Sequence, residues 1–184
     1  GRLKLMSLHH LALLRHAQRR WQETTELCRA ILRQRLALRG AVSRPTRLIL
    51  ADSLLELGDL DGAAEQIEQV RRQRLSLMEM TTFLLIQLDY QHRIRAWGAM
   101  MEDAGRKVEL AETMPSGPAG RTQALMALAA QKLEQTEWRD WLRGRAELLA
   151  DAGEIVKWRP KLQELWAEYR QEATEAPTDQ RREE

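Results

Sequence analysis

The sequence predicts an all-α fold, built as an array of helical hairpins. Leu, Ala, Arg, Glu and Gln dominate the 184 residues, and these residue types favour helices. Apolar residues recur at spacings of three and four, and no alternating stretch is long enough for a strand. Residues 47–70 read as two amphipathic helices folded over a turn, a unit that cannot bury its apolar surface alone and therefore predicts further hairpins.

The hairpin at 47–70 has clear signals for both helices and for the turn. Gly58 stands where the first helix ends and the backbone can adopt a positive φ. Asp59 or Asp61 can cap the second helix, whose first turn gains from acidic charge. The apolar positions follow helical spacing: Leu48, Leu50, Ala51, Leu54, Leu55 and Leu57 on the first helix, and Ala63, Ala64, Ile67 and Val70 on the second.

Glycines, prolines and polar clusters divide the remaining chain into further helices. The clearest loop is predicted at Met114–Gly120, which holds two prolines and two glycines. The polar tail 173–184 is predicted to be disordered, which leaves 1–172 as one repeat domain. Because the chain opens with Gly1, we expect a fragment of a larger protein. The predicted helices span 3–18, 21–38, 45–57, 60–75, 77–95, 97–113, 119–135, 138–151 and 155–171.

A repeat of 39 residues follows from superposing the turns. Trp21, Leu60 and Trp138 each begin a predicted second helix, at separations of 39 (60 − 21) and 78 (138 − 60). The small residues Ala12, Ala51 and Ala129 stand nine residues before each of them. The third turn is expected near Ala99, where Trp97-Gly98 is out of register, so this copy is divergent or has a longer first helix.

The hairpin pattern resembles that of the tetratricopeptide repeat superfamily. The resemblance is carried by Leu50, Ala51, Leu54, Gly58, Leu60, Ala63 and Ile67. It implies a right-handed α-solenoid of about four hairpins plus a C-terminal capping helix, with the first helices lining a concave groove. It also implies a non-catalytic scaffold or adaptor that binds a peptide or protein, or another copy of itself.

Registration on the family implies which side chains line that groove. The basic and amide clamp that grips a terminal carboxylate in some members is not evident, since Asp52 and Glu56 are acidic where the clamp needs basic or amide groups. A receptor for chaperone tails is therefore disfavoured. The implied groove residues are His9, Leu13, His16, Asp52, Glu56, Gln87, Gln91 and Arg95.

Charge is divided unevenly along the chain. Residues 1–50 hold 11 basic and two acidic residues, a net charge of +9, and residues 51–184 carry −7. The basic block can serve an acidic protein, nucleic acid or the acidic end of a neighbouring copy, or it can be a solvated face. Phosphate or nucleic-acid binding by this block is the alternative function, and it ranks below protein binding because only Trp21 is near enough to stack on a base. The candidate cations are Arg29, Arg33, Arg35, Arg39, Arg44 and Arg47.

No pattern of residues indicates catalysis, a cofactor or a metal. His9 and His16 are two helical turns apart, too far to share an ion, and paired-cysteine spacings are absent. Cys28 stands at an inward position and is interpreted as a small buried hydrophobic residue. No apolar run is long enough to cross a membrane, and a single cysteine fits a reducing, cytoplasmic setting.

The last predicted helix carries one stripe of apolar and aromatic residues, and it is the candidate capping helix. The stripe can cover the open end of the array, which we favour, or it can dock a partner. Its members are Ile155, Trp158, Leu162, Leu165, Trp166 and Tyr169.

Overall fold

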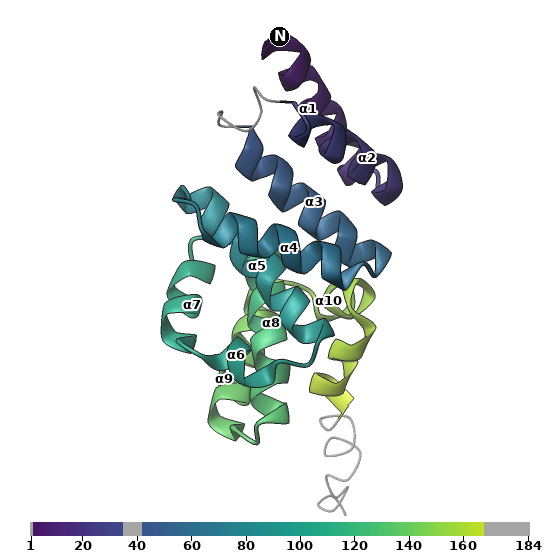
Figure 1. Ribbon diagram of the computed structural model, residues 1–184. Coiled ribbons are helices and arrows are strands. Elements are labelled where there is room, and N and C mark those ends of the chain that lie inside the picture. Colours follow the sequence, from purple (N-terminus) through teal and green to yellow (C-terminus); the bar gives the residue numbers. More distant parts are fainter. Residues whose placement is uncertain (1, 35–41, 168–184) are drawn as a thin grey trace, which may run out of the picture. The chain divides into compact units, whose positions relative to one another are not determined.

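The computed structural model describes residues 2–34 and 42–167, and within these ranges every regular element is a helix (Figure 1). The predicted all-α class is thus confirmed. The chain divides into two compact units, residues 1–114 and residues 115–184. Whether both belong to the single repeat domain expected for 1–172 stays a prediction, and the expected tail at 173–184 lies outside the described residues.

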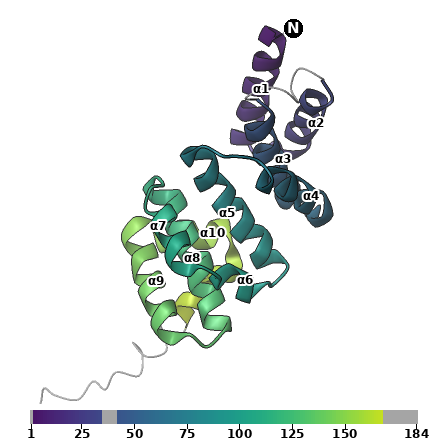
Figure 2. The same cartoon turned by 60° about the vertical axis from the view of Figure 1, so that its left-hand side comes forward.

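The first unit contains successive helices that stack on one another. Helix α3 lies between α2 and α4, and the helices α1, α3 and α5 contact one another in turn (Figures 1 and 2). The helices of this unit are α1 (Arg2–Ala17), α2 (Trp21–Leu32), α3 (Ser43–Leu57), α4 (Leu60–Arg71), α5 (Leu77–Arg93), α6 (Trp97–Met101) and α7 (Ala104–Ala111).

Helix α3 is the centre of this stack because it is apolar on more than one face. Leu50 and Leu55 are 2% and 0% exposed, and Leu48 and Ile49 are buried as well. The small residue Ala51, like Ala12 on α1, is almost completely buried, which lets neighbouring helices approach closely. The apolar residues of 47–57 therefore belong to a helix that packs against other helices on both sides.

Four hairpin turns share one backbone geometry. Arg19, Gly58, Arg95 and Glu134 have φ values of 57°, 79°, 59° and 58°, in the left-handed region. Each turn has the two hydrogen bonds of a Schellman motif. At Gly58, for example, its own N–H donates to Leu55 O and the next N–H donates to Leu54 O.

The shared geometry corrects the predicted repeat register. The spacings between the left-handed residues are 39 (58 − 19), 37 (95 − 58) and 39 (134 − 95). Trp97 therefore occupies the position of Trp21 and Leu60, two residues after the turn. The third repeat is two residues short, and its turn is at Arg95 rather than near Ala99.

The single helix predicted for 97–113 is wrong, because the chain breaks between α6 and α7. Asp103 adopts a left-handed φ of 50° there. The ammonium group of Lys107 donates hydrogen bonds to the carbonyls of Ala99 and Met100, at 2.7 and 3.1 Å. These carbonyls lie at the C-terminal end of α6, where a positive charge is favourable. Lysine capping thus stabilises a break that neither glycine nor proline marks.

The second unit is centred on α8 (Ser116–Lys132), which packs along α9 (Thr136–Leu149). The loop predicted at Met114–Gly120 is wrong from Ser116 onward, because a proline in the first turn of a helix loses no intrahelical hydrogen bond. Gly120 permits the close packing of the two helices. A Cβ atom at Gly120 would lie 2.6 Å from the Cβ atom of Ala150.

The continuous helix predicted for 155–171 is also wrong. Helix α10 (Ala152–Trp158) ends before Pro160, which begins the 3-10 turn η1 (Pro160–Gln163). Pro160 lacks a backbone N–H and forces the preceding residue into an extended conformation. The apolar members Ile155, Leu162 and Leu165 are nevertheless buried, and Tyr169 lies outside the described residues.

Candidate functional site

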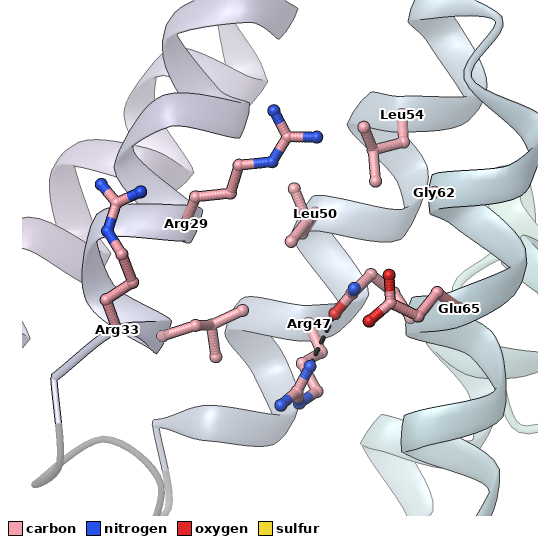
Figure 3. Close-up of a pocket in the computed structure, with 9 residues that line it drawn as sticks. Arg29, Arg33, Arg47, Leu50, Leu54, Gly62 and Glu65 are labelled. Carbon is pink, nitrogen blue, oxygen red and sulfur yellow. Dashed lines mark hydrogen bonds between the residues drawn. The ribbon is translucent and has the colours of Figure 1, made fainter.

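A groove in the first unit is lined by helices α2, α3 and α4. Helix α3 forms its floor with Leu50 and Leu54, and α2 and α4 form its walls (Figure 3). The cavity has a volume of about 280 Å³. We call it the arginine groove; its lining residues are Arg29, Leu32, Arg33, Arg47, Leu50, Leu54, Gly62, Glu65 and Gln66.

Three of the six arginines proposed from sequence line this groove. Arg29 and Arg33 are one turn apart on α2, and Arg47 comes from α3 (Figure 3). Glu65 is the single acidic residue of the lining, so the groove carries a formal charge of +2. Arg35 and Arg39 lie outside the described residues.

The three guanidinium groups differ in how firmly they are held. Arg47 Nη1 donates a 2.7 Å hydrogen bond to Gln66 Oε1, and Arg47 Nε is buried with no hydrogen-bond partner. The Arg29 side chain is 53% exposed and lies 3.9 Å from the Asp59 carboxylate, a loose ion pair. Arg33 is exposed and makes no ion pair within residues 2–34 and 42–167. The guanidinium groups of Arg29 and Arg33 are thus available to a ligand, whereas that of Arg47 is held by Gln66.

Sequence reasoning missed Gln66, which orients Arg47. Gln66 is 8% exposed and stands among the buried positions Ala63, Ile67 and Val70 of α4. An amide on the apolar face of a helix is the signal that could have found it, because a buried amide requires a hydrogen-bond partner.

Arg44, also in the predicted basic cluster, is neutralised within the protein. Its Nε donates to Glu79 Oε1 at 2.9 Å. Burial of Glu79 raises its pKa, but hydrogen bonds from Ser76 and Arg44 outweigh this effect, so the pKa of Glu79 lies below its usual value. This pair connects the start of α3 to the capping box of α5.

The residues predicted to line a concave groove mostly connect the stacked helices. His9 Nδ1 lies 3.0 Å from Thr46 Oγ1, and His16 Nε2 lies 2.6 Å from Asp52 Oδ2, so both histidines join α1 to α3. Desolvation by burial, with a smaller contribution from His10, lowers the pKa of His9. His9, His16 and Asp52 are half-buried, and each has a protein partner for one of its polar atoms.

The interface between α3 and α5 also contains paired polar and charged side chains. Arg93 of α5 pairs with Glu56 of α3 at 3.2 Å and with Asp89 at 3.1 Å. Arg95 is exposed in the left-handed turn after α5. Of the two glutamines on α5, Gln87 is half-buried and Gln91 is 8% exposed with no hydrogen-bond partner for its Oε1. Each interface therefore combines apolar contact with a polar or charged pair.

A shallow apolar hollow of about 330 Å³ lies on α9 in the second unit. Its lining residues are Glu137, Trp138 and Trp141. The two indole rings meet edge to face, with centroids 5.8 Å apart. Trp138, which begins a predicted second helix, is 38% exposed.

Three further expectations from the sequence concern Cys28, metal binding and membrane crossing. Cys28 is completely buried, as predicted, and desolvation raises the pKa of its thiol to about 12. In the part of the chain that the structure describes, no group of three or more His, Cys, Asp or Glu side chains is placed to hold a metal ion. Within the same ranges, no helix combines the length and hydrophobicity that a membrane crossing requires.

Comparison of the chain with protein-family models, with curated proteins and with solved structures finds no match.

Proposed function

We propose that this protein is a non-catalytic helical-repeat module that binds an acidic segment of another protein in the arginine groove. The observation that supports it most is that Arg29, Arg33 and Arg47 line one groove together with Leu32, Leu50 and Leu54. Guanidinium groups pair with carboxylates through charge-assisted hydrogen bonds, and the leucine floor suits an apolar side chain between acidic ones.

The wider architecture is part of the proposal. We propose that the chain is a tetratricopeptide-like, right-handed solenoid of four hairpins, with α10 and η1 in place of a capping helix. The four equivalent turns at Arg19, Gly58, Arg95 and Glu134 support this arrangement. Such arrays present grooves between neighbouring helices, which are suited to binding a peptide.

An acidic protein segment fits the groove better than nucleic acid does. Among the described lining residues of the groove no aromatic ring is available for base stacking. The apolar part of the lining, in which Leu32 is the partly exposed leucine, offers nothing to a phosphodiester chain, whereas it can contact the side chain of a leucine or valine. Nucleic acid is therefore an outcome of the test rather than a second proposal.

The test is fluorescence anisotropy with a labelled peptide that alternates Leu with Asp and Glu. The matched neutral peptide, with Asn and Gln in place of the acids, should bind at least about tenfold more weakly. Arg29→Glu with Arg33→Glu should abolish binding of the acidic peptide. Arg74→Glu with Arg106→Glu changes the charge equally at exposed positions outside the groove and should leave binding unchanged.

Two results would overturn the proposal. One is equal loss of binding in both charge-reversal variants, which would indicate only long-range attraction. The other is tight binding of a dT12 oligonucleotide with no binding of the acidic peptide, which would assign the groove to nucleic acid.

A further inference from the structure

The hollow on α9 combines two indole rings with one carboxylate, those of Trp138, Trp141 and Glu137. The rings are perpendicular, with an angle of 89° between their planes, so they form a corner rather than a flat patch. Trp138 is 38% exposed and Trp141 47%, which leaves both rings accessible to a ligand. The face of an indole ring is electronegative and attracts cations. We call this site, lined by these three residues, the tryptophan hollow.

Trp141 already has a cation on the side away from Glu137. The guanidinium carbon of Arg145 lies 5.7 Å from the centre of the Trp141 ring, and Arg145 is not a lining residue of the hollow. Glu137, Trp141 and Arg145 follow at intervals of four and therefore share one face of α9. The carboxylate of Glu137 makes no ion pair with another residue in the described ranges. The row thus begins with an unpaired anion beside an indole ring.

The neighbouring acidic residue on α9 is engaged within the protein. Asp140 pairs with Arg139 at 2.8 Å and with Arg143 at 3.6 Å. The hydrogen bond from Arg139 is the largest of the effects that lower the pKa of Asp140. Arg139 and Arg143 are therefore held away from the hollow by Asp140, and Glu137 is the carboxylate that a ligand can reach.

The second unit also shows which cation suits its indole rings. Arg121 and Arg159 lie 5.1 and 4.3 Å from the centre of the Trp158 ring, and Arg145 on Trp141 is a contact of the same kind. A guanidinium group is planar and weakly hydrated, so it can stack on a ring while its N–H groups donate to a carboxylate. An ammonium group is more strongly hydrated and lacks this planar shape. Two rings and one carboxylate therefore suit arginine better than lysine.

We infer that the tryptophan hollow binds an arginine side chain of another protein. The guanidinium group stacks on the indole rings of Trp138 and Trp141 and donates hydrogen bonds to the carboxylate of Glu137. The lining comes from one helix, so the hollow cannot enclose a small molecule, whereas it can receive a side chain that a larger surface presents. The inference does not depend on the arginine groove, which lies in the other unit and attracts the opposite charge.

The test is an NMR titration of the full chain, in which indole N–H signals report individual tryptophans. The probe is the capped tripeptide Gly-Arg-Gly, and the signals of Trp138 and Trp141 should shift while those of Trp21 and Trp97 stay in place. A control peptide carries citrulline, which has the shape of arginine without the charge. It should bind about tenfold more weakly, because both the ion pair and the cation–π attraction are lost. A second control peptide carries lysine and should also bind more weakly.

The decisive variants change the charge or the ring of the hollow. Glu137→Gln keeps the shape of the side chain and should weaken binding of the arginine peptide about threefold, the effect of one exposed charge pair. Glu134→Gln makes the same change at an exposed position outside the hollow and should bind normally. Trp138→Leu should weaken binding about threefold through loss of cation–π attraction. Circular dichroism confirms that each variant is folded.

Four outcomes would overturn the inference. They are binding of a control peptide as tight as that of the arginine peptide, equal effects of Glu137→Gln and Glu134→Gln, and a dimer that Trp138→Leu dissociates, which would assign the hollow to a second copy of the chain. The fourth is tighter binding of free arginine than of the capped peptide, which would indicate a small-molecule site. Arg29→Glu with Arg33→Glu should leave the shifts intact, so the failure of either proposal is distinguishable from that of the other.

Discussion

The left-handed turn at Gly58 permits a direct measurement of the free energy that a residue with a side chain needs to adopt this backbone conformation. Gly58→Ala places a methyl group on a backbone with φ of 79°, and this methyl group would meet no atom within 4 Å. The substitution therefore tests backbone conformation without a change in packing. Gly105→Ala is the matched control, because its added methyl group also meets nothing within 4 Å, whereas its backbone is helical.

The expected magnitude follows from two opposing terms. A left-handed conformation costs an L-residue about 1–2 kcal/mol. Replacement of glycine by alanine recovers about 0.5–1 kcal/mol, because the unfolded chain loses less conformational freedom on folding. Gly58→Ala should therefore lower the free energy of unfolding by about 0.5–1 kcal/mol. Gly105→Ala should raise it by a similar amount, so that the two variants differ by about 1–2 kcal/mol.

The assay is urea denaturation of both variants, followed by circular dichroism at the helix band. Both glycines lie in the unit formed by residues 1–114, so the same transition reports both. The reverse substitution, Arg95→Gly, should stabilise the unit by about 0.5–1 kcal/mol. Equal midpoints for Gly58→Ala and Gly105→Ala would refute the assignment of a strained turn.

Three further predictions concern packing, reactivity and pH. Gly120→Ala should destabilise the unit of residues 115–184 by about 1–3 kcal/mol in thermal unfolding, because the added methyl group overlaps a neighbouring alanine, whereas Gly117→Ala has open space and should not. Cys28 should not react with a thiol reagent at pH 8 until urea unfolds the protein, since its thiol is buried with a pKa of about 12; reaction at the rate of a free thiol would contradict its burial. The folded-state pKa of Glu79 is lowered, so its ionised form stabilises the fold above the usual glutamate pKa of about 4.3, and this contribution is lost as the pH falls through the folded-state pKa. Glu79→Gln should thus reduce the free energy of unfolding at pH 7 and have little effect near pH 3, and an equal effect at both pH values would show that the charge is unimportant.

The sequence predicted helices well where local chemistry agreed with packing. Gly58 ends α3 with a positive φ, and the Asp59 side chain accepts a hydrogen bond from Gly62 N, as expected for an N-cap. The equivalent turns at Arg19, Arg95 and Glu134 have no glycine, so composition gave no sign of their left-handed backbone. Tertiary packing fixes them instead, because closing each hairpin buries its apolar faces.

For the arginine groove, the sequence indicated the type of residue involved but not which of these residues lie together. Spacing on one helix places Arg29 beside Arg33, but the approach of Arg47 depends on how α2 packs on α3. The same limit applies to His16 and Asp52, which were expected to face a ligand and instead bind each other. A pattern within one helix identifies a polar face, whereas its partner is decided by contacts distant in sequence.

The equivalent backbone geometry of the turns also makes the repeats exchangeable parts. A segment cut between Gly58 and Arg95 begins and ends at the same pair of Schellman hydrogen bonds, so a duplicated copy can join its neighbours without a new linker. Gain or loss of a whole repeat by unequal recombination would then leave the Schellman turns between the remaining repeats unchanged. A protein with the same repeat should therefore be recognisable by left-handed turns spaced 37 to 39 residues apart, even where the side chains between these turns differ.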